Sequence, residues 1–238
     1  MLVVTVAPMI RGVIFDLFGT LTDGRLEWER ERLYLELAMI LKVPGPSFAR
    51  LMHETFHLRS TGAFGDVRQT LMRLCSLLGA QPDATDLDAA VELRLRIERR
   101  LAEPRADAVN TLQRLRERGL SISVISDCGP ETAVVWPTLP FAHLVESPVF
   151  SCDVKQRKPH PSLYRLAATR IGVEPGQCLY VGDGGSRELT GARHAGMRAV
   201  RLAVPGEDWG SKLRFDPDSE WSGQDLSSLS ELLDREIN

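Results

Sequence analysis

The feature that most constrains this 238-residue chain is a change in the spacing of its apolar residues. A short apolar run, residues 12–15, ends at Asp16 and is soon followed by a glycine, as a buried parallel strand often ends. Over residues 25–101 apolar side chains recur at helical spacing with no strand pattern, and after Pro104 strands and helices alternate. Such alternation is typical of a parallel sheet with helices on both faces. The sequence therefore predicts an α/β fold whose parallel sheet carries an all-helical insertion between its first two strands.

Turn signals divide both parts of the chain into elements. Breaks at residues 44–46, 62–65 and 79–82 cut the helical segment into about four helices. After Pro104 we expect strands at 122–125, 149–150, 179–181 and 199–202. We expect helices at 108–118, 162–171 and 226–235, and one further helix that ends at His194. The stretch 206–224 is polar and poor in pattern.

Charge and hydropathy exclude several classes of function. Lys and Arg number 29 against 32 Asp and Glu, so the net charge is −3 and the basic excess of nucleic-acid-binding proteins is absent. The apolar stretch at residues 2–10 is too short to span a membrane and follows no basic export-signal segment. The four cysteines form no C-x-x-C pair, which favours reduced thiols. We expect a cytoplasmic protein without nucleic-acid or membrane partners, and the sequence leaves its oligomeric state open.

Polar clusters follow the predicted strands at their carboxyl ends, where sheets of this kind bind ligands. Each cluster taken alone is typical of a turn or a helix cap. Lys158, just after a further apolar run, adds a basic side chain at the same edge of the sheet, and the set therefore indicates one shared site. The clusters are Asp16 with Gly19 and Thr20, Ser126 with Asp127, and Gly182 with Asp183, Gly184, Gly185 and Ser186.

The motifs at these positions resemble the four motifs of the haloacid dehalogenase-like hydrolases. In the family's order they are Asp16–Leu21 (DLFGTL), Ser126, Lys158–Pro161 (KPHP) and Gly182–Glu188 (GDGGSRE), spread over about residues 11–202. The resemblance implies a Rossmann-like core in residues 1–22 and 105–238, with a helical C1 cap in residues 23–104. It also implies hydrolysis that begins with attack on the substrate by an aspartate.

The resemblance assigns the catalytic roles to three residues. Asp16 would be the nucleophile, because an aspartate of ordinary pKa, near ~3.9, is ionised at neutral pH and needs no base to form an acyl-phosphate. Lys158 would supply a positive charge, and the Ser126 hydroxyl would bond phosphoryl oxygens. Asp127 is expected to be a loop residue beside the site.

The resemblance also implies a magnesium ion. Its ligands would be Asp16, the Phe18 carbonyl and Asp183, and it would relieve the repulsion between Asp16 and a phosphate dianion. Glu188 stands where the family's last motif often has Asp, and its longer side chain would keep a metal contact through water.

Phe18 is the main departure from the family pattern. Phosphatases of the family usually carry a second aspartate two residues after the nucleophile, and general acid–base help of this kind is worth roughly 10²- to 10⁴-fold in rate. Members without it include dehalogenases and phosphonate hydrolases. Asp183 favours phosphoryl transfer, because the dehalogenase branch needs no metal carboxylate. We therefore expect a Mg²⁺-dependent phosphatase acting on a small phosphorylated molecule, with a dehalogenase or phosphonatase-like hydrolase and a non-catalytic phospho-ligand binder as alternatives.

A rival pattern lies in the predicted cap. Residues 53–57 (HETFH) match the H-E-x-x-H pattern of zinc proteases, with two histidines at helical spacing and a glutamate as base. No further ligand of the extended pattern follows, so a zinc metalloprotease is a remote alternative. The favoured interpretation is a cap helix whose His53, His57 and Arg59 contact the substrate, as Gly19 and Thr20 do from the core. Which cap residues face the site is left open.

Overall fold

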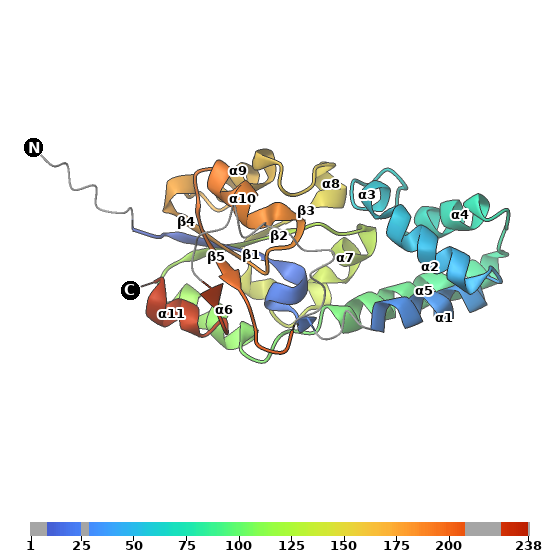
Figure 1. Ribbon diagram of the computed structural model, residues 1–238, viewed down its shortest axis with the longest axis horizontal. Helices are drawn as coiled ribbons and strands as arrows, with labels where there is room; N and C mark the ends of the chain where they lie inside the picture. The colour runs from blue at the N-terminus through green and yellow to red at the C-terminus, as the bar shows by residue number, and fades with distance from the viewer. Residues whose placement is uncertain (1–8, 25–28, 208–224, 238) are drawn as a thin grey trace, which may run out of the picture.

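A six-stranded sheet forms the core of the computed structural model, which describes residues 9–24, 29–207 and 225–237. All paired strands are parallel, in the order β3-β2-β1-β4-β5-β6 (Figure 1). Their bounds are β1 Gly12–Asp16, β2 Ser121–Ser126, β3 Ser147–Phe150, β4 Cys178–Gly182, β5 Arg198–Leu202 and β6 Asp225–Leu226. Because β1 lies between β2 and β4, the strand order reverses at the carboxyl end of β1, where such sheets bind ligands.

The central strands are apolar because both faces of the sheet are covered. Every residue of β1 and β4 is buried. α9 (Pro161–Arg170) and α10 (Glu188–His194) pack on one face, and α6 (Ala108–Glu117) and α11 (Glu231–Arg235) lie on the other (Figure 1). The short helices α7 (Pro130–Val135) and α8 (Ser151–Val154) follow β2 and β3. The predicted α/β fold with a Rossmann-like parallel sheet is confirmed.

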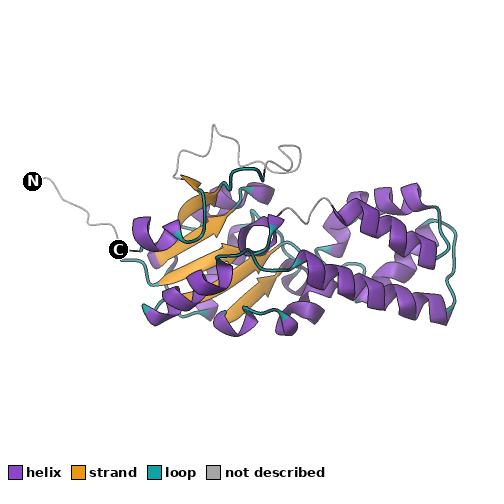
Figure 2. Ribbon diagram, turned by 90° about the horizontal axis from the view of Figure 1, so that it is seen from below, coloured by secondary structure: helices purple, strands orange, loops and turns teal. Residues whose placement is uncertain are grey.

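The segment between β1 and α6 is helical and packs around its own apolar cluster. Its helices are α1 Arg30–Ile40, α2 Gly45–Glu54, α3 Phe56–Arg59, α4 Val67–Leu77 and α5 Ala84–Leu101. The Asp66 side chain accepts a hydrogen bond from the Gln69 backbone amide at 2.8 Å, and Gln69 Oε1 accepts one from the Asp66 backbone amide at 3.1 Å, so a capping box begins α4. We refer to α1–α5 as the cap. In Figure 2 the strand arrows point toward it.

Two connections join the cap to the core, and Thr22 pairs with Pro104 between them in an isolated antiparallel bridge. This pairing supports, as a proposal, the predicted division of the chain into residues 1–22 and 105–238 on one side and 23–104 on the other. Among the described helices, none combines the length and apolar character needed to cross a membrane.

Two predicted helices differ from the structure. The helix expected to run through residues 53–57 is interrupted at Thr55, whose hydroxyl donates to the Leu51 carbonyl at 2.5 Å, a back-bond that often bends helices. The last helix begins at Glu231 rather than at residue 226, because Asp225–Leu226 pairs with β5. Of the polar stretch 206–224, residues 208–224 lie outside the described part of the chain.

Candidate active site

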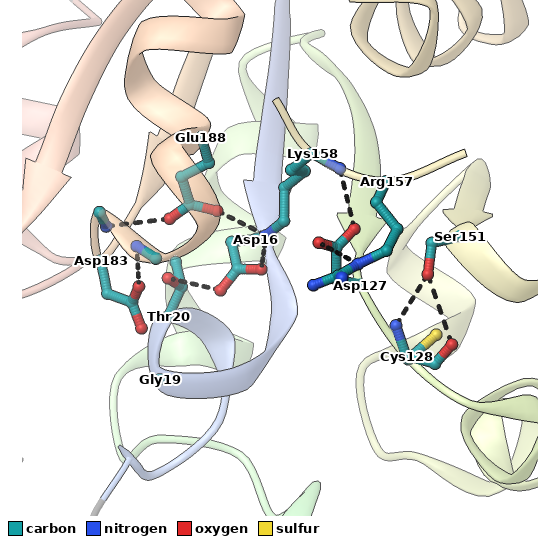
Figure 3. Close-up of polar contacts among 12 residues, drawn as sticks. Asp16, Gly19, Thr20, Asp127, Cys128, Ser151, Arg157, Lys158, Asp183 and Glu188 are labelled. Atoms are coloured by element: carbon teal, nitrogen blue, oxygen red, sulfur yellow. Dashed lines mark hydrogen bonds and ion pairs between the residues drawn. The ribbon is translucent and has the colours of Figure 1, made fainter. Parts of the chain in front are cut away.

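The carboxyl ends of β1, β2 and β4 bring the predicted polar clusters to one place (Figure 3). Asp16 is the last residue of β1 and lies beside Ile125 of β2, one residue before Ser126. Asp183 directly follows β4 on the other side. Asp16 and Ser126 are both buried at the end of their strands. The site therefore sits where the strand order reverses, as the sequence predicts.

The turn after Asp16, η1 (Leu17–Leu21), is held by its own side chains. Gly19 has φ 82°, a left-handed conformation that glycine adopts without strain. The Thr20 hydroxyl donates to Asp16 Oδ2 at 3.2 Å. The Arg105 guanidinium, which the sequence analysis missed, donates to the carbonyl oxygens of Gly19 at 2.8 Å and Thr20 at 3.0 Å. These contacts hold the loop that follows the proposed nucleophile. They account for the position of the Thr20 side chain without a contact to substrate.

Lys158 lies between two carboxylates. Its Nζ is 2.5 Å from Asp16 Oδ1 and 2.5 Å from Glu188 Oε2. Burial alone would lower the pKa of Lys158, but the charges of Asp16 and Glu188 outweigh it and raise the pKa well above its usual value. Asp127 accepts a hydrogen bond from the Lys158 backbone amide at 3.0 Å, and therefore holds the lysine loop from beside the site (Figure 3).

Glu188 is fully buried at the first residue of α10. Its carboxylate also accepts hydrogen bonds from the Tyr180 hydroxyl at 2.8 Å and from the Gly184 amide at 3.0 Å. A side chain at Gly182 would collide with it, so the glycine leaves the room that the longer acid needs. Burial raises the pKa of Glu188 well above its usual value, and the Asp16 carboxylate acts in the same direction.

Asp16, Asp183 and Glu188 each place a carboxylate oxygen within 4.8 Å of the others. Lys158 is the cation that contacts Asp16 and Glu188 among the described residues, and it balances one of the three negative charges. A divalent cation with oxygen ligands would neutralise the rest. The donor set therefore fits a hard cation such as Mg²⁺.

Phe18 lies at the junction of core and cap. Its half-buried ring packs against both apolar clusters, and the Arg30 guanidinium lies 5.7 Å from the ring centre. The position that bears an acid in related phosphatases thus holds an apolar ring at the cap interface. The metal contact predicted for the Phe18 carbonyl stays a prediction.

A pocket of about 300 Å³ lies between cap and core, and Phe18, His53, Arg59 and Asp127 are among its lining residues. His57 is not among them. Its ring is exposed, with Nδ1 3.1 Å from the Glu54 carbonyl oxygen, because the break at Thr55 turns it away from His53. The structure gives no support to the expected substrate contact of His57, which stays a prediction. Arg68 is also remote, since it pairs with Asp88 on the surface.

The zinc-protease alternative loses its geometry at the same break. The two histidines do not share one continuous helical face. Within the described part of the chain, the only group of three or more metal-binding side chains is the carboxylate cluster, and it contains neither histidine.

The sequence analysis also missed Tyr180 and the buried pair Arg94 and Glu131. Tyr180 sits in a strand whose pattern indicates only a core residue, and its role depends on contact with Glu188. Arg94 and Glu131 come from segments 37 residues apart, and only the folded chain brings them together.

Comparison with known proteins places these features in a family context. The sequence matches the family model for haloacid dehalogenase-like hydrolases over residues 10–196. A glyceraldehyde 3-phosphate phosphatase of Methanopyrus kandleri is 28% identical over 215 residues, which make up 82% of this chain and 84% of that protein. A phosphoglycolate phosphatase of Xanthomonas campestris pv. campestris (strain 8004) is 29% identical over 228 residues and 91% of each chain. A solved L-2-haloacid dehalogenase from Xanthobacter autotrophicus shares the fold, with TM-score 0.65, 20% identity and coverage of 97% of this chain and 100% of that one.

Proposed function

This chain belongs to the haloacid dehalogenase-like hydrolases, and on that premise we propose that it is a Mg²⁺-dependent phosphatase of small molecules with Asp16 as nucleophile. The observation that carries the proposal is the cluster of three carboxylates, Asp16, Asp183 and Glu188, around one lysine. A metal-binding carboxylate beside the nucleophile serves phosphoryl transfer, where negative charge must be neutralised, and has little use in displacing a halide. The printed names of the two phosphatase relatives support the same substrate class.

The proposed reaction has two steps. An oxygen of Asp16 attacks the phosphorus atom, the bond from phosphorus to the leaving oxygen breaks, and the leaving group departs with the electron pair. Water then attacks the phosphorus of the aspartyl-phosphate and releases inorganic phosphate and the free Asp16 carboxylate. Asp16, Asp183 and Glu188 would hold a Mg²⁺ ion, which would supply positive charge to the phosphoryl oxygens.

Lys158 and Ser126 would serve the phosphoryl group. Lys158 contacts Asp16 and can hold the carboxylate in place while offering its remaining donor to a phosphoryl oxygen. Ser126 is buried at the adjacent strand end, one residue after the Ile125 that pairs with Asp16. Groups held in place before substrate binds are the usual basis of electrostatic stabilisation.

A substrate screen tests this function. Phosphate esters and anhydrides, halo-acids and phosphonates would be offered with Mg²⁺ and with a chelator, and release of phosphate and halide measured. We expect phosphate release from phosphate esters that needs Mg²⁺, and its loss together with Mg²⁺ binding in Asp183→Asn. Halide release that persists in the chelator would show that the protein is a dehalogenase and not a phosphatase. Binding of phosphate esters without release of phosphate would indicate a non-catalytic binder.

A further inference from the structure

The pocket between cap and core has walls that favour an apolar, flat group. Phe18 comes from the core turn, Tyr34 from α1 and Phe56 from α3, and all three aromatic side chains line the space. Phe18 and Asp127 of the lining follow the strand ends that carry Asp16 and Ser126, so the pocket adjoins the loops of the site although Asp16 does not line it. A substrate whose phosphoryl group meets Asp16 would therefore place its leaving group here.

Two carboxylates of the pocket lining share one cationic partner. Arg94 of α5 is buried and donates to Glu98 at 2.9 Å and to Glu131 of α7. The Thr132 hydroxyl donates to the other oxygen of Glu98. Asp127, a third acid of the lining, pairs with Arg157 across 3.4 Å. Arg94 thus serves two of these acids and Arg157 serves the third.

Arg59 is a lining cation whose buried guanidinium keeps an unfilled hydrogen-bond donor within the described chain. It is 3% exposed, and its Nη2 donates to the Met52 carbonyl oxygen at 2.5 Å. Its Nη1 lies 3.9 Å from Glu131, beyond hydrogen-bond distance, and its Nε has no hydrogen-bond partner within the described chain. Burial lowers the pKa of the Arg59 guanidinium, while nearby Tyr34 and Glu131 act in the opposite direction. A buried guanidinium with an unfilled donor can gain a hydrogen bond from an added anion.

We propose that Arg59 binds a carboxylate on the leaving group of the substrate, and that Phe18, Tyr34 and Phe56 hold the apolar body to which that carboxylate is attached. The proposal rests on the proposed phosphatase function. Guanidinium groups bind carboxylates through paired hydrogen bonds, and aromatic walls favour a flat, apolar body. The substrate class is therefore a phosphate ester whose leaving group is both aromatic or similarly flat and acidic. Arg59 acts in selecting the substrate and takes no part in the bond changes.

Two aryl phosphates of similar leaving-group acidity test the proposal. Phenyl phosphate and 3-carboxyphenyl phosphate would be compared with Mg²⁺ present in the unmodified protein, Arg59→Gln, Arg59→Lys and the control Arg68→Gln. We expect the unmodified protein and Arg68→Gln to favour the carboxylated ester by about tenfold or more in kcat/KM, mainly through KM. Arg59→Gln should abolish this preference while changing phenyl phosphate hydrolysis much less, and Arg59→Lys should retain part of it.

Direct binding keeps the proposal testable if the Arg59 variants fail to fold. Calorimetry on the unmodified protein should show that benzoate binds about tenfold or more tightly than benzamide, which has the same shape without the charge. Equal binding of the two, or equal kcat/KM for the two esters in the unmodified protein, would overturn the proposal and leave the phosphatase function intact. Tight benzoate binding without phosphate release from either ester would support the carboxylate subsite and overturn the proposed function.

Discussion

At the residue scale, Phe18 decides how the leaving group departs. The ring can neither protonate a leaving oxygen nor activate water, and it is packed between the two apolar clusters. We predict rates that depend steeply on leaving-group pKa, with aryl and acyl phosphates preferred over alkyl phosphates.

Restoring an acid tests this prediction. Phe18→Asp should raise steady-state hydrolysis of an alkyl phosphate by up to roughly 10²-fold, because a general acid can then protonate the leaving oxygen. Phe18→Asn, which has nearly the same shape without the acid, is the control for loss of the ring. Equal rates in Phe18→Asp and Phe18→Asn, with a flat dependence on leaving-group pKa in the unmodified protein, would show that another residue already supplies the proton.

Tyr180 and Tyr164 provide a matched pair around Glu188. The Tyr180 hydroxyl donates to the Glu188 carboxylate at 2.8 Å, whereas the Tyr164 hydroxyl donates to the Glu188 backbone carbonyl at 2.9 Å. Hydrogen bonds to charged groups contribute about 1.5–3 kcal/mol, against about 1 kcal/mol for neutral ones. Tyr180→Phe should therefore lower the free energy of unfolding by about 2 kcal/mol and Tyr164→Phe by about 1 kcal/mol, measured by urea denaturation.

Tyr180 is also expected to position the carboxylate cluster. Tyr180→Phe should raise the Mg²⁺ concentration needed for half-maximal phosphate release, while Tyr164→Phe should leave it unchanged. An equal Mg²⁺ requirement in both variants would restrict Tyr180 to a structural role.

At the scale of elements, β1, β2 and β4 could be predicted because each is an apolar run that ends in a polar cluster. The interruption of the helix at Thr55 could not be predicted, because Thr occurs within helices and its side-chain bond to Leu51 is visible only in the folded chain. β6 was missed for a related reason. Two residues carry no pattern of their own, and pairing with β5 makes them a strand.

The contact between α5 and α7 joins the cap to the core through buried charges. Glu131 of α7 contacts Arg94 of α5, and α3 adds Arg59 at 3.9 Å. Burial alone would raise the pKa of Glu131, but Arg94 and Arg59 outweigh it and hold the pKa below its usual value. The ionised carboxylate therefore stabilises the folded chain at neutral pH.

This contribution should vanish in acid. A lowered folded-state pKa gives stability that is present above the ordinary glutamate pKa of ~4.3 and is lost as the pH falls from there through the folded value. At pH 7 Glu131→Gln should lower the free energy of unfolding by about 3 kcal/mol, because it leaves Arg94 short of a partner. Urea denaturation should show the difference from the unmodified protein narrowing below pH ~4.3.

The exposed pair of Glu92 with Arg96 gives the control for that series. Glu92→Gln should change the free energy of unfolding by less than about 1 kcal/mol at any pH. A difference between Glu131→Gln and the unmodified protein that does not change with pH would contradict the account of the buried pair.

At the scale of the whole molecule, two bodies with separate apolar cores meet at the site. The core residues of the site could be predicted because strand ends converge in any parallel sheet. The cap residues could not be assigned to the pocket, since the rotation of each cap helix against the core depends on packing between segments distant in sequence. Arg59 lines the pocket and His57 does not, although the two residues lie only two positions apart in α3.

The central claim is that phosphate hydrolysis passes through Asp16. Without an acid–base residue at position 18, the aspartyl-phosphate should be hydrolysed slowly and accumulate. The direct measurement is acid quenching of the protein during turnover of phenyl phosphate with Mg²⁺, followed by peptide mass spectrometry. We predict a phosphoryl group on Asp16 in the unmodified protein, and in Asp16→Asn no such group and turnover lower by at least about 10³-fold. Retained turnover in Asp16→Asn, or a phosphoryl group on a different residue, would contradict the account.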